Sequence, residues 1–222
     1  MLYELHTHTA VSRDSLLAPA ALVRASRAKG LGRVAVTDHN RLGGALAAHT
    51  LAPDLIILGE EIMTAQGELL GYFMREEIPG GLAPAETIAR LRAQGAVISV
   101  SHPFDRLRRG AWREADLAAI LPDVDALEVF NSRCIYPEDN TRALAFAREH
   151  AKLGTVGSDA HAAIELGYAA LRMAPVNTPA EFLAALAGAE HLTRLSSPFI
   201  HFVSAWAKVW TKIKKRLSAQ KG

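Results

Sequence analysis

The sequence predicts a single α/β domain in which a largely parallel sheet is covered by helices on its outside. Short runs of branched apolar residues alternate with longer stretches rich in Ala, Leu and Arg that have helical period. Polar clusters follow most of the apolar runs, which is typical of strands that end at a binding face. Seven predicted strands in a chain of 222 residues favour a barrel or a doubly wound sheet.

The order of elements follows from periodicity and from residues that begin or end helices. Ala18 and Pro19 begin the first predicted helix and Gly30 ends it, while Pro84 and Gly95 bound the second. Proline is favoured in the first turn of a helix and glycine just beyond its last turn. The predicted strands are 2–5, 33–36, 55–58, 69–74, 96–100, 126–130 and 153–156, and the predicted helices are 18–29, 84–94, 114–121, 139–149 and 179–187.

Composition excludes several classes of protein. Half of the residues are hydrophobic, which excludes a disordered chain. The single cysteine, Cys134, excludes an internal disulfide and a cysteine-based zinc site, and it fits a reducing compartment. The first residues show no signal-peptide pattern and no apolar run is long enough to span a membrane, so we expect a soluble, cytoplasmic protein.

The net charge of +2 conceals an asymmetry along the chain. Six of the 25 basic residues lie in 208–222, which has no acidic residue, so the remainder has 19 basic against 23 acidic residues. The basic character therefore belongs to the tail, and long nucleic acid is not an expected partner of the body. Apolar residues recur at helical spacing after Pro198, which predicts an amphipathic helix over 198–222, separate from a barrel over 1–197.

Two interpretations of this predicted helix remain open. Its apolar stripe could pack on the barrel with its lysines in solvent, or it could bind an anionic membrane surface or a partner protein. The oligomeric state is not predicted.

Histidines and carboxylates gather at the ends of the predicted strands. Because the carboxyl ends of parallel strands meet at one edge, we expect these side chains to share one rim. Imidazole and carboxylate together suit Zn, Mn or Fe, with Mg as a further candidate, and their number exceeds what one ion can use. We therefore expect two or three divalent metal ions. The residues are His6, His8, Asp14, Asp38, His39, Glu61, His102, Asp159 and His161.

Neighbouring residues in this set have different predicted roles. His6 and His8 lie two apart on a strand, so they point the same way and can grip one ion. Glu60 points away from Glu61, so only Glu61 is expected to reach a metal. Asp38 is expected to orient His39 through its ring nitrogen rather than to bind metal.

The joint motif pattern resembles the PHP (polymerase and histidinol phosphatase) family. The resemblance covers residues 1 to about 175 and implies a distorted seven-stranded β/α barrel with a two- or three-metal centre that hydrolyses phosphate esters. The motifs are His6-x-His8, Ser12-x-Asp14, Thr37-Asp38-His39-Asn40, Gly59-x-Glu61, His102-Pro103 and Ser158-Asp159-Ala160-His161.

The resemblance also implies a distribution of ligands. His6, His8, Glu61 and Asp159 resemble the ligands of one ion. Glu61 and His102 resemble those of a second, with Asn131 as a candidate to complete it, and Asp14, His39 and His161 resemble those of a third. The short segment between Glu61 and His102 leaves no room for the inserted domain of larger family members, so the substrate is expected to be a small phosphorylated molecule.

The implied chemistry is attack on phosphorus by a hydroxide held between the ions. Arg133 is the predicted phosphate clamp because a guanidinium can bind two phosphate oxygens, and the loop 105–113 offers Arg106, Arg108 and Arg109. His39 or His161 is a candidate general acid. Two alternatives are a metal-binding module without turnover, against which the full ligand set argues, and an amide hydrolase of a related barrel type, which commonly uses a lysine that the predicted strand ends lack.

Overall fold

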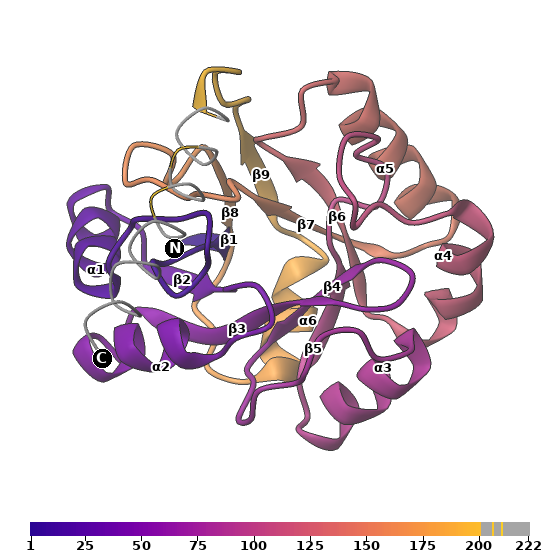
Figure 1. Cartoon of the computed structure of the whole chain (residues 1–222), viewed down its shortest axis with the longest axis horizontal. Coiled ribbons are helices and arrows are strands. Elements are labelled where there is room, and N and C mark those ends of the chain that lie inside the picture. The colour runs from indigo at the N-terminus through magenta and orange to yellow at the C-terminus, as the bar shows by residue number, and fades with distance from the viewer. Residues whose placement is uncertain (201–205, 207–209, 211–222) are drawn as a thin grey trace.

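The computed structural model describes residues 1–200, 206 and 210, and its strands curve into a nearly closed barrel (Figure 1). Nine strands form one sheet in the order β7-β6-β5-β4-β3-β2-β1-β8-β9. Helices α1 to α5 lie around the outside of the sheet. The strands are β1 (Leu2–Thr7), β2 (Arg33–Val36), β3 (Ile56–Met63), β4 (Glu68–Tyr72), β5 (Val97–Val100), β6 (Ala126–Asn131), β7 (Leu153–Gly157), β8 (Ala169–Arg172) and β9 (Glu190–Thr193).

Helices connect most of the parallel strands. Pro19, Pro84, Pro137 and Pro179 stand in the first turns of four of them, where a missing backbone N–H leaves no bond unmade. The helices are α1 (Pro19–Ala28), α2 (Gly43–Leu51), α3 (Pro84–Ala93), α4 (Glu114–Ile120), α5 (Pro137–Glu149) and α6 (Pro179–Leu186), and one 3₁₀ turn covers Leu121–Asp123.

Strand direction decides which residues reach the same end of the barrel. β1, β2 and β3 pair in parallel, as do β5, β6 and β7. β4 pairs antiparallel with both β3 and β5. The carboxyl ends of six strands therefore share one rim with the amino end of β4, and this rim is where the predicted polar clusters lie.

The barrel closes between β1 and the segment that follows β7. Thr7 forms a parallel bridge with Ala160, and the backbone N–H of His8 donates to the Ala160 carbonyl at 2.8 Å. Gly157 permits this approach, because a Cβ atom there would lie 2.3 Å from the His6 Cβ and 2.5 Å from Glu128 Oε1. The closure brings His6 and Asp159 to the same side of the barrel.

A methyl group at Gly157 is expected to open this closure. The His6 Cβ is fixed to a buried strand and cannot move aside, so Gly157→Ala should cost about 1–3 kcal/mol of unfolding free energy. Chemical denaturation measures this loss, and Gly188→Ala, where an added Cβ meets nothing within 4 Å, is the matched control. Equal stability of the two variants would contradict the described closure.

The opposite end of the barrel is filled by α6. Phe182 is fully buried and packs against Tyr72 and Phe73 with ring centroids 5.9 and 5.5 Å apart. Tyr72 ends the antiparallel strand β4, so this contact lies away from the rim. The rim is therefore the open end of the molecule.

The structure confirms the α/β class and corrects parts of the prediction. All seven predicted strands are present, but β8 and β9 extend the sheet to nine in the described residues, and α2 was not predicted. β4 runs against its neighbours. The predicted C-terminal helix over 198–222 lies outside the described residues apart from 198–200, Trp206 and Trp210. Among the described residues, no helix is long and apolar enough to cross a membrane.

Candidate metal centre

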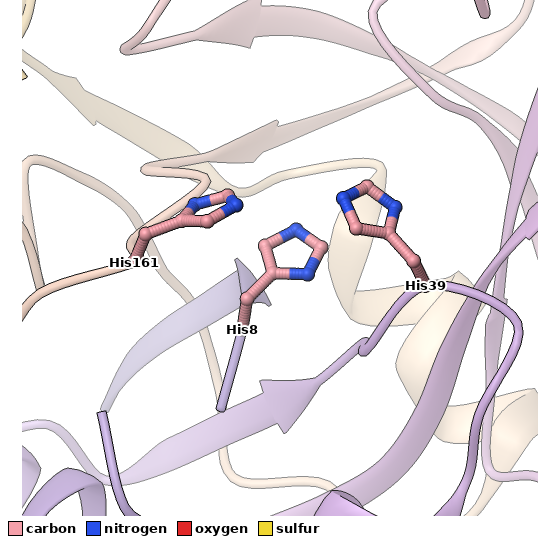
Figure 2. A group of neighbouring side chains, drawn as sticks. All are labelled: His8, His39 and His161. Atoms are coloured by element: carbon pink, nitrogen blue, oxygen red, sulfur yellow. The ribbon is translucent and has the colours of Figure 1, made fainter. Parts of the chain in front are cut away.

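Histidine rings from three strand exits meet at the rim. Figure 2 shows His8, which follows β1, between His39, which follows β2, and His161, which follows β7. The ring centroids of His39 and His161 lie 4.4 and 4.3 Å from that of His8. One nitrogen from each ring lies within 4.8 Å of the others, so these rings could hold one ion.

His6, His8, Glu61 and Asp159 form the most buried part of the cluster. The Nε2 atoms of His6 and His8 are 3.1 Å apart, as expected for side chains on the same face of β1. His8 Nε2 lies 3.1 Å from Asp159 Oδ1 and 3.4 Å from Glu61 Oε2. His6 Nε2 lies 3.3 Å from Glu61 Oε1. Two imidazoles and two carboxylates thus converge on one point.

Glu61 connects this group to a second one. Glu61 Oε1 lies 3.0 Å from His102 Nε2, which in turn lies 3.4 Å from Glu68 Oε2. His39, Glu61 and Glu68 also have donor atoms within 4.8 Å of one another. Glu68 begins β4 and was not among the predicted residues.

Asp14 connects the two outer histidines. Its carboxylate oxygens lie 3.5 Å from His39 Nε2 and 3.4 Å from His161 Nε2. The His39 side chain is 26% exposed, whereas the other rim histidines are buried. The centre is therefore entered over His39 and Asp14.

Two of the buried donor atoms lack the hydrogen bonds that buried oxygens normally accept, which suits them to bind a divalent ion. Glu61 Oε2 and Asp159 Oδ1 are buried, and although His39 Nδ1 and His8 Nε2 lie 2.9 and 3.1 Å from them, neither oxygen accepts a well-aligned hydrogen bond from the described residues. Buried carboxylate oxygens normally have such partners, and imidazole with carboxylate is a common donor set for Zn, Mn and Fe. The histidines and carboxylates at the rim therefore fit the metal centre that the family resemblance implies.

Electrostatics keep His8 and Glu61 in the state that binds metal. Burial, together with the rings of His161 and His39, lowers the pKa of His8 to about 3, so its imidazole is neutral and offers a lone pair. Burial opposes ionisation of Glu61, but His6 and His39 outweigh it and hold the pKa of Glu61 well below its ordinary value. Metal ligands must be deprotonated, and both side chains are. At His6 and His39 burial opposes protonation, but neighbouring carboxylates such as Glu61 outweigh it and raise the pKa of both rings well above its ordinary value, so these rings would release protons on binding metal.

Two ligand candidates have a backbone conformation that is rare for non-glycine residues. His102 has φ of 22° and Asp159 has φ of 54°. Such conformations cost free energy and persist where the surrounding structure fixes them, often at functional sites. Here they stand directly after β5 and β7, where the chain leaves the barrel.

Two buried glutamates inside the barrel hold the ligands in place. Glu128 Oε1 lies 2.9 Å from His6 Nδ1, and its Oε2 accepts the backbone N–H of His102 at 2.8 Å. Glu4 accepts the backbone N–H groups of Ser158 and Gly167, both at 2.9 Å. A carboxylate on the far nitrogen of a metal-binding histidine fixes the ring and its tautomer. Both glutamates could have been found from the sequence, because each is a charged residue within an otherwise apolar strand.

Asp38 supports the site in a different way from the one predicted. Its carboxylate accepts hydrogen bonds from the Thr9 hydroxyl and the Ser12 hydroxyl, both at 2.6 Å. Ser12 Oγ accepts the backbone N–H of His39 at 3.1 Å and lies 3.4 Å from His8 Nδ1. Asp38 thus orients the histidines through Ser12 rather than through the ring of His39.

The arginines have unequal access to the centre. Arg108 pairs with Asp159 and, at 3.3 Å, with Asp105. Arg133 is buried, and its Nη1 lies 2.6 Å from His161 Nδ1. Arg106 is bound instead by Asp139 at 2.6 Å and stacks on Tyr136. Of Arg106 and Arg108, Arg108 is the one that reaches the metal-site residues.

Asn131 and Glu60 complete the placement of predicted residues. The Asn131 amide oxygen accepts the backbone N–H of Arg133 at 2.9 Å, and its nitrogen donates to Glu128 at 3.2 Å. Asn131 therefore lies at the edge of the centre, and metal ligation by it stays a prediction. Glu60 points away from the centre, as predicted, and accepts the backbone N–H of Ile78 at 3.0 Å.

The fold and the convergent donors define a barrel-like α/β protein with a candidate metal centre at its open end. Residues 137–190 match the family model described as PHP-associated (PHP_C). An uncharacterized protein of Methanocaldococcus jannaschii, MJ0417, is 36% identical over 193 residues, which are 82% of this chain and 78% of the relative. The chain belongs to the PHP domain family.

Solved structures share the fold at low sequence identity. A two-domain protein from Bacteroides vulgatus, described as containing a predicted PHP-like metal-dependent phosphoesterase, is 19% identical with a TM-score of 0.69, over 87% of this chain and 65% of that chain. An amidohydrolase from Chromobacterium violaceum, solved with bound sulfate and no metal, is 14% identical with a TM-score of 0.59, over 91% of this chain and 96% of that chain. These two likenesses concern the fold.

Proposed function

We propose that this protein is a metal-dependent phosphoesterase that hydrolyses small phosphate esters at a two- or three-metal centre. The observation that carries the proposal is the convergence of His6, His8, Glu61 and Asp159, in which one buried oxygen of each carboxylate lacks a hydrogen bond from the described residues. The structurally similar protein from Bacteroides vulgatus supports this reaction class. In the proposal, Glu61 is shared between two ions and Asp14, His39 and His161 hold a third.

Divalent ions at this centre would supply an activated water and would neutralise charge on the phosphoryl oxygens. The protein side chains position the phosphate. Arg133, predicted to clamp the phosphate, is buried between His161 at 2.6 Å and Glu165 at 3.4 Å, so its role in this proposal is to position His161, and direct phosphate binding by it stays a prediction. Arg108 adds a guanidinium fork beside Asp159, where a phosphate can accept two hydrogen bonds. His39, the most exposed of the rim histidines, or His161 can protonate the leaving group only if that ring is not committed to a metal ion.

The function is tested by assaying purified protein for phosphate release. Phosphate monoesters and diesters should be screened with Zn, Mn, Fe and Mg supplied separately to metal-depleted protein. Turnover that needs one of these metals supports the proposal. Metal binding without release from any ester would favour the alternative of a metal-binding module, and cleavage of amides alone would favour the amidohydrolase alternative that the Chromobacterium violaceum structure suggests.

Two arginines of the same loop should differ in their effect on catalysis. Arg108→Gln removes a charge-assisted contact at the centre. It should lower kcat/KM by a factor that corresponds to about 1.5–3 kcal/mol of lost transition-state stabilisation. Arg106→Gln is the matched control, because Arg106 pairs with Asp139 instead, and it should stay near wild type. Steady-state kinetics on the best ester measures both variants. A larger loss for Arg106→Gln would make Arg106 the substrate-binding residue and exclude Arg108.

A further inference from the structure

Exposed apolar side chains lie on the loops that leave one side of the rim. Thirteen large apolar residues are exposed in the described structure, and six of them lie on the loops that follow β1, β5, β6 and β7. The exits of β2 and β3 carry none among the described residues. The six are Val11, Leu16, Leu107, Ile135, Tyr136 and Ile164.

These loops are neighbours around the barrel. β5, β6 and β7 are adjacent in the sheet, and the Thr7–Ala160 bridge brings the exit of β7 against that of β1. The segment 195–200 joins them, because the backbone N–H of Ser196 donates to the Ser132 carbonyl at 2.7 Å. This segment adds the exposed Leu195 and Phe199. The four loops and residues 195–200 are called the apolar arc below.

The charges exposed along the apolar arc are mostly positive. Arg13 and Arg109 are exposed, and Arg106 is exposed although it is paired with Asp139. The acidic residues of these loops, Asp14, Asp105, Asp159 and Glu165, are buried in the site or beside it. Two glutamates at the starts of the helices that follow these loops are exposed: Glu138 on α5, and Glu114 on α4, which pairs with Arg142.

The chain that continues from the apolar arc is also basic and aromatic. Residues 208–222 carry six basic residues and no acidic one. Trp206 and Trp210 are exposed, with ring centroids 6.5 Å apart. Apolar side chains bordered by arginine and lysine, with tryptophan nearby, have the composition of surfaces that bind anionic lipid bilayers.

We propose that the apolar arc docks on an anionic membrane surface and presents the metal centre to phosphate esters of amphiphilic molecules held there. This inference deepens the proposed function and rests on it for the substrate class. The docking surface itself does not require catalysis. Exposed apolar side chains on the loops around a polar centre fit a substrate whose phosphate enters the rim while its apolar part stays in the bilayer.

The docking surface is tested with matched double variants in the full chain. Leu107 and Ile164 are 58% and 63% exposed on the apolar arc, whereas Leu46 and Leu51 are 46% and 56% exposed on α2. Leu107→Glu/Ile164→Glu and Leu46→Glu/Leu51→Glu thus each add two negative charges at positions of comparable exposure. Both variants keep the basic tail. Co-sedimentation with vesicles of phosphatidylcholine and phosphatidylglycerol, and with phosphatidylcholine alone, measures binding.

The wild type should bind the anionic vesicles and not the neutral ones. The variant on the apolar arc should weaken that binding by at least roughly tenfold, while the α2 variant should stay within about twofold of wild type. Equal binding by all three proteins would show that the tail alone contacts lipid and would overturn the proposal. No binding by the wild type would overturn it as well.

Melting temperatures show whether the variants fold. Suppose that the wild type binds no vesicles and that Leu107→Glu/Ile164→Glu melts at a lower temperature than the wild type. Another part of the protein would then cover the apolar arc, and the proposal would be overturned. Val11→Glu/Leu16→Glu, from the exit of β1, provides a second variant if the first does not fold. It should show the same loss of vesicle binding.

Hydrolysis separates this inference from the proposed function. With the metal that supports turnover, phosphatidic acid in vesicles and soluble glycerol phosphate are compared. The variant on the apolar arc should lose activity on the first and keep activity on the second. Vesicle binding that depends on the apolar arc, without release from any ester, would reject the proposed function and leave the docking surface standing. Equal activity of variant and wild type on both esters would reject the amphiphilic substrate.

Discussion

Replacement of Glu61 by glutamine is expected to abolish metal-dependent phosphate release. The Glu61 carboxylate faces four histidines, with His39 Nδ1 at 2.9 Å and His102 Nε2 at 3.0 Å as its nearest partners. An amide of the same shape keeps the fold but cannot bridge two cations. The loss in kcat should exceed the roughly 10- to 100-fold effect of removing an outer partner of a metal ligand. Phosphate release at saturating metal measures it.

Glu60→Gln is the matched control for this substitution. Glu60 is the neighbouring residue on β3 and is also buried, but its carboxylate accepts the Ile78 backbone N–H on the opposite face. Glutamine can accept the same hydrogen bond, so this variant should keep wild-type activity. If Glu61→Gln retained wild-type turnover with its full metal content, Glu61 could not be the shared ligand.

Replacement of His8 by alanine is expected to have the second of the two largest effects. His8 Nε2 lies close to Asp159 and Glu61, and its ring lies between those of His39 and His161. Loss of this ring removes a ligand of the ion that His6, Glu61 and Asp159 would also hold. We expect loss of phosphate release and of at least one bound ion in a protein that remains folded. Metal analysis of the purified variant accompanies the kinetic assay.

His49→Ala provides the comparison for His8→Ala. His49 lies on α2, away from the rim, and its Nδ1 lies 3.2 Å from the Ile56 carbonyl. This variant should keep both activity and metal content. Equal metal loss in the two variants would point to a general loss of structure and would remove the support for His8 as a ligand.

Strand polarity explains which site residues were predictable. His6, His39, His102 and Asp159 stand at or after the ends of parallel strands, so their convergence follows from the fold class. Glu68 was missed because β4 is antiparallel and brings its first residue to the rim. The short connection between β3 and β4 was an available signal, since a parallel connection needs a dozen residues or more.

The missed secondary structure has weak local signals. α2 begins with Gly43 and Gly44, which are poor helix formers. Gly44 is needed there, because a Cβ would lie 1.9 Å from Asp38 Oδ2 and 2.3 Å from Thr9 Oγ1. β8 contains two alanines and β9 is mostly exposed, so neither shows the branched apolar run of a buried strand.

Metal binding by the isolated chain tests the central claim most directly. Metal-depleted wild-type protein and the Glu61→Gln variant should each be titrated with Zn and with Mn, and bound metal should be counted by elemental analysis. The proposed centre predicts two or three ions per wild-type chain and fewer in the variant. A wild-type chain that binds no divalent ion, or a variant that binds as many ions as wild type with the same affinity, would contradict it.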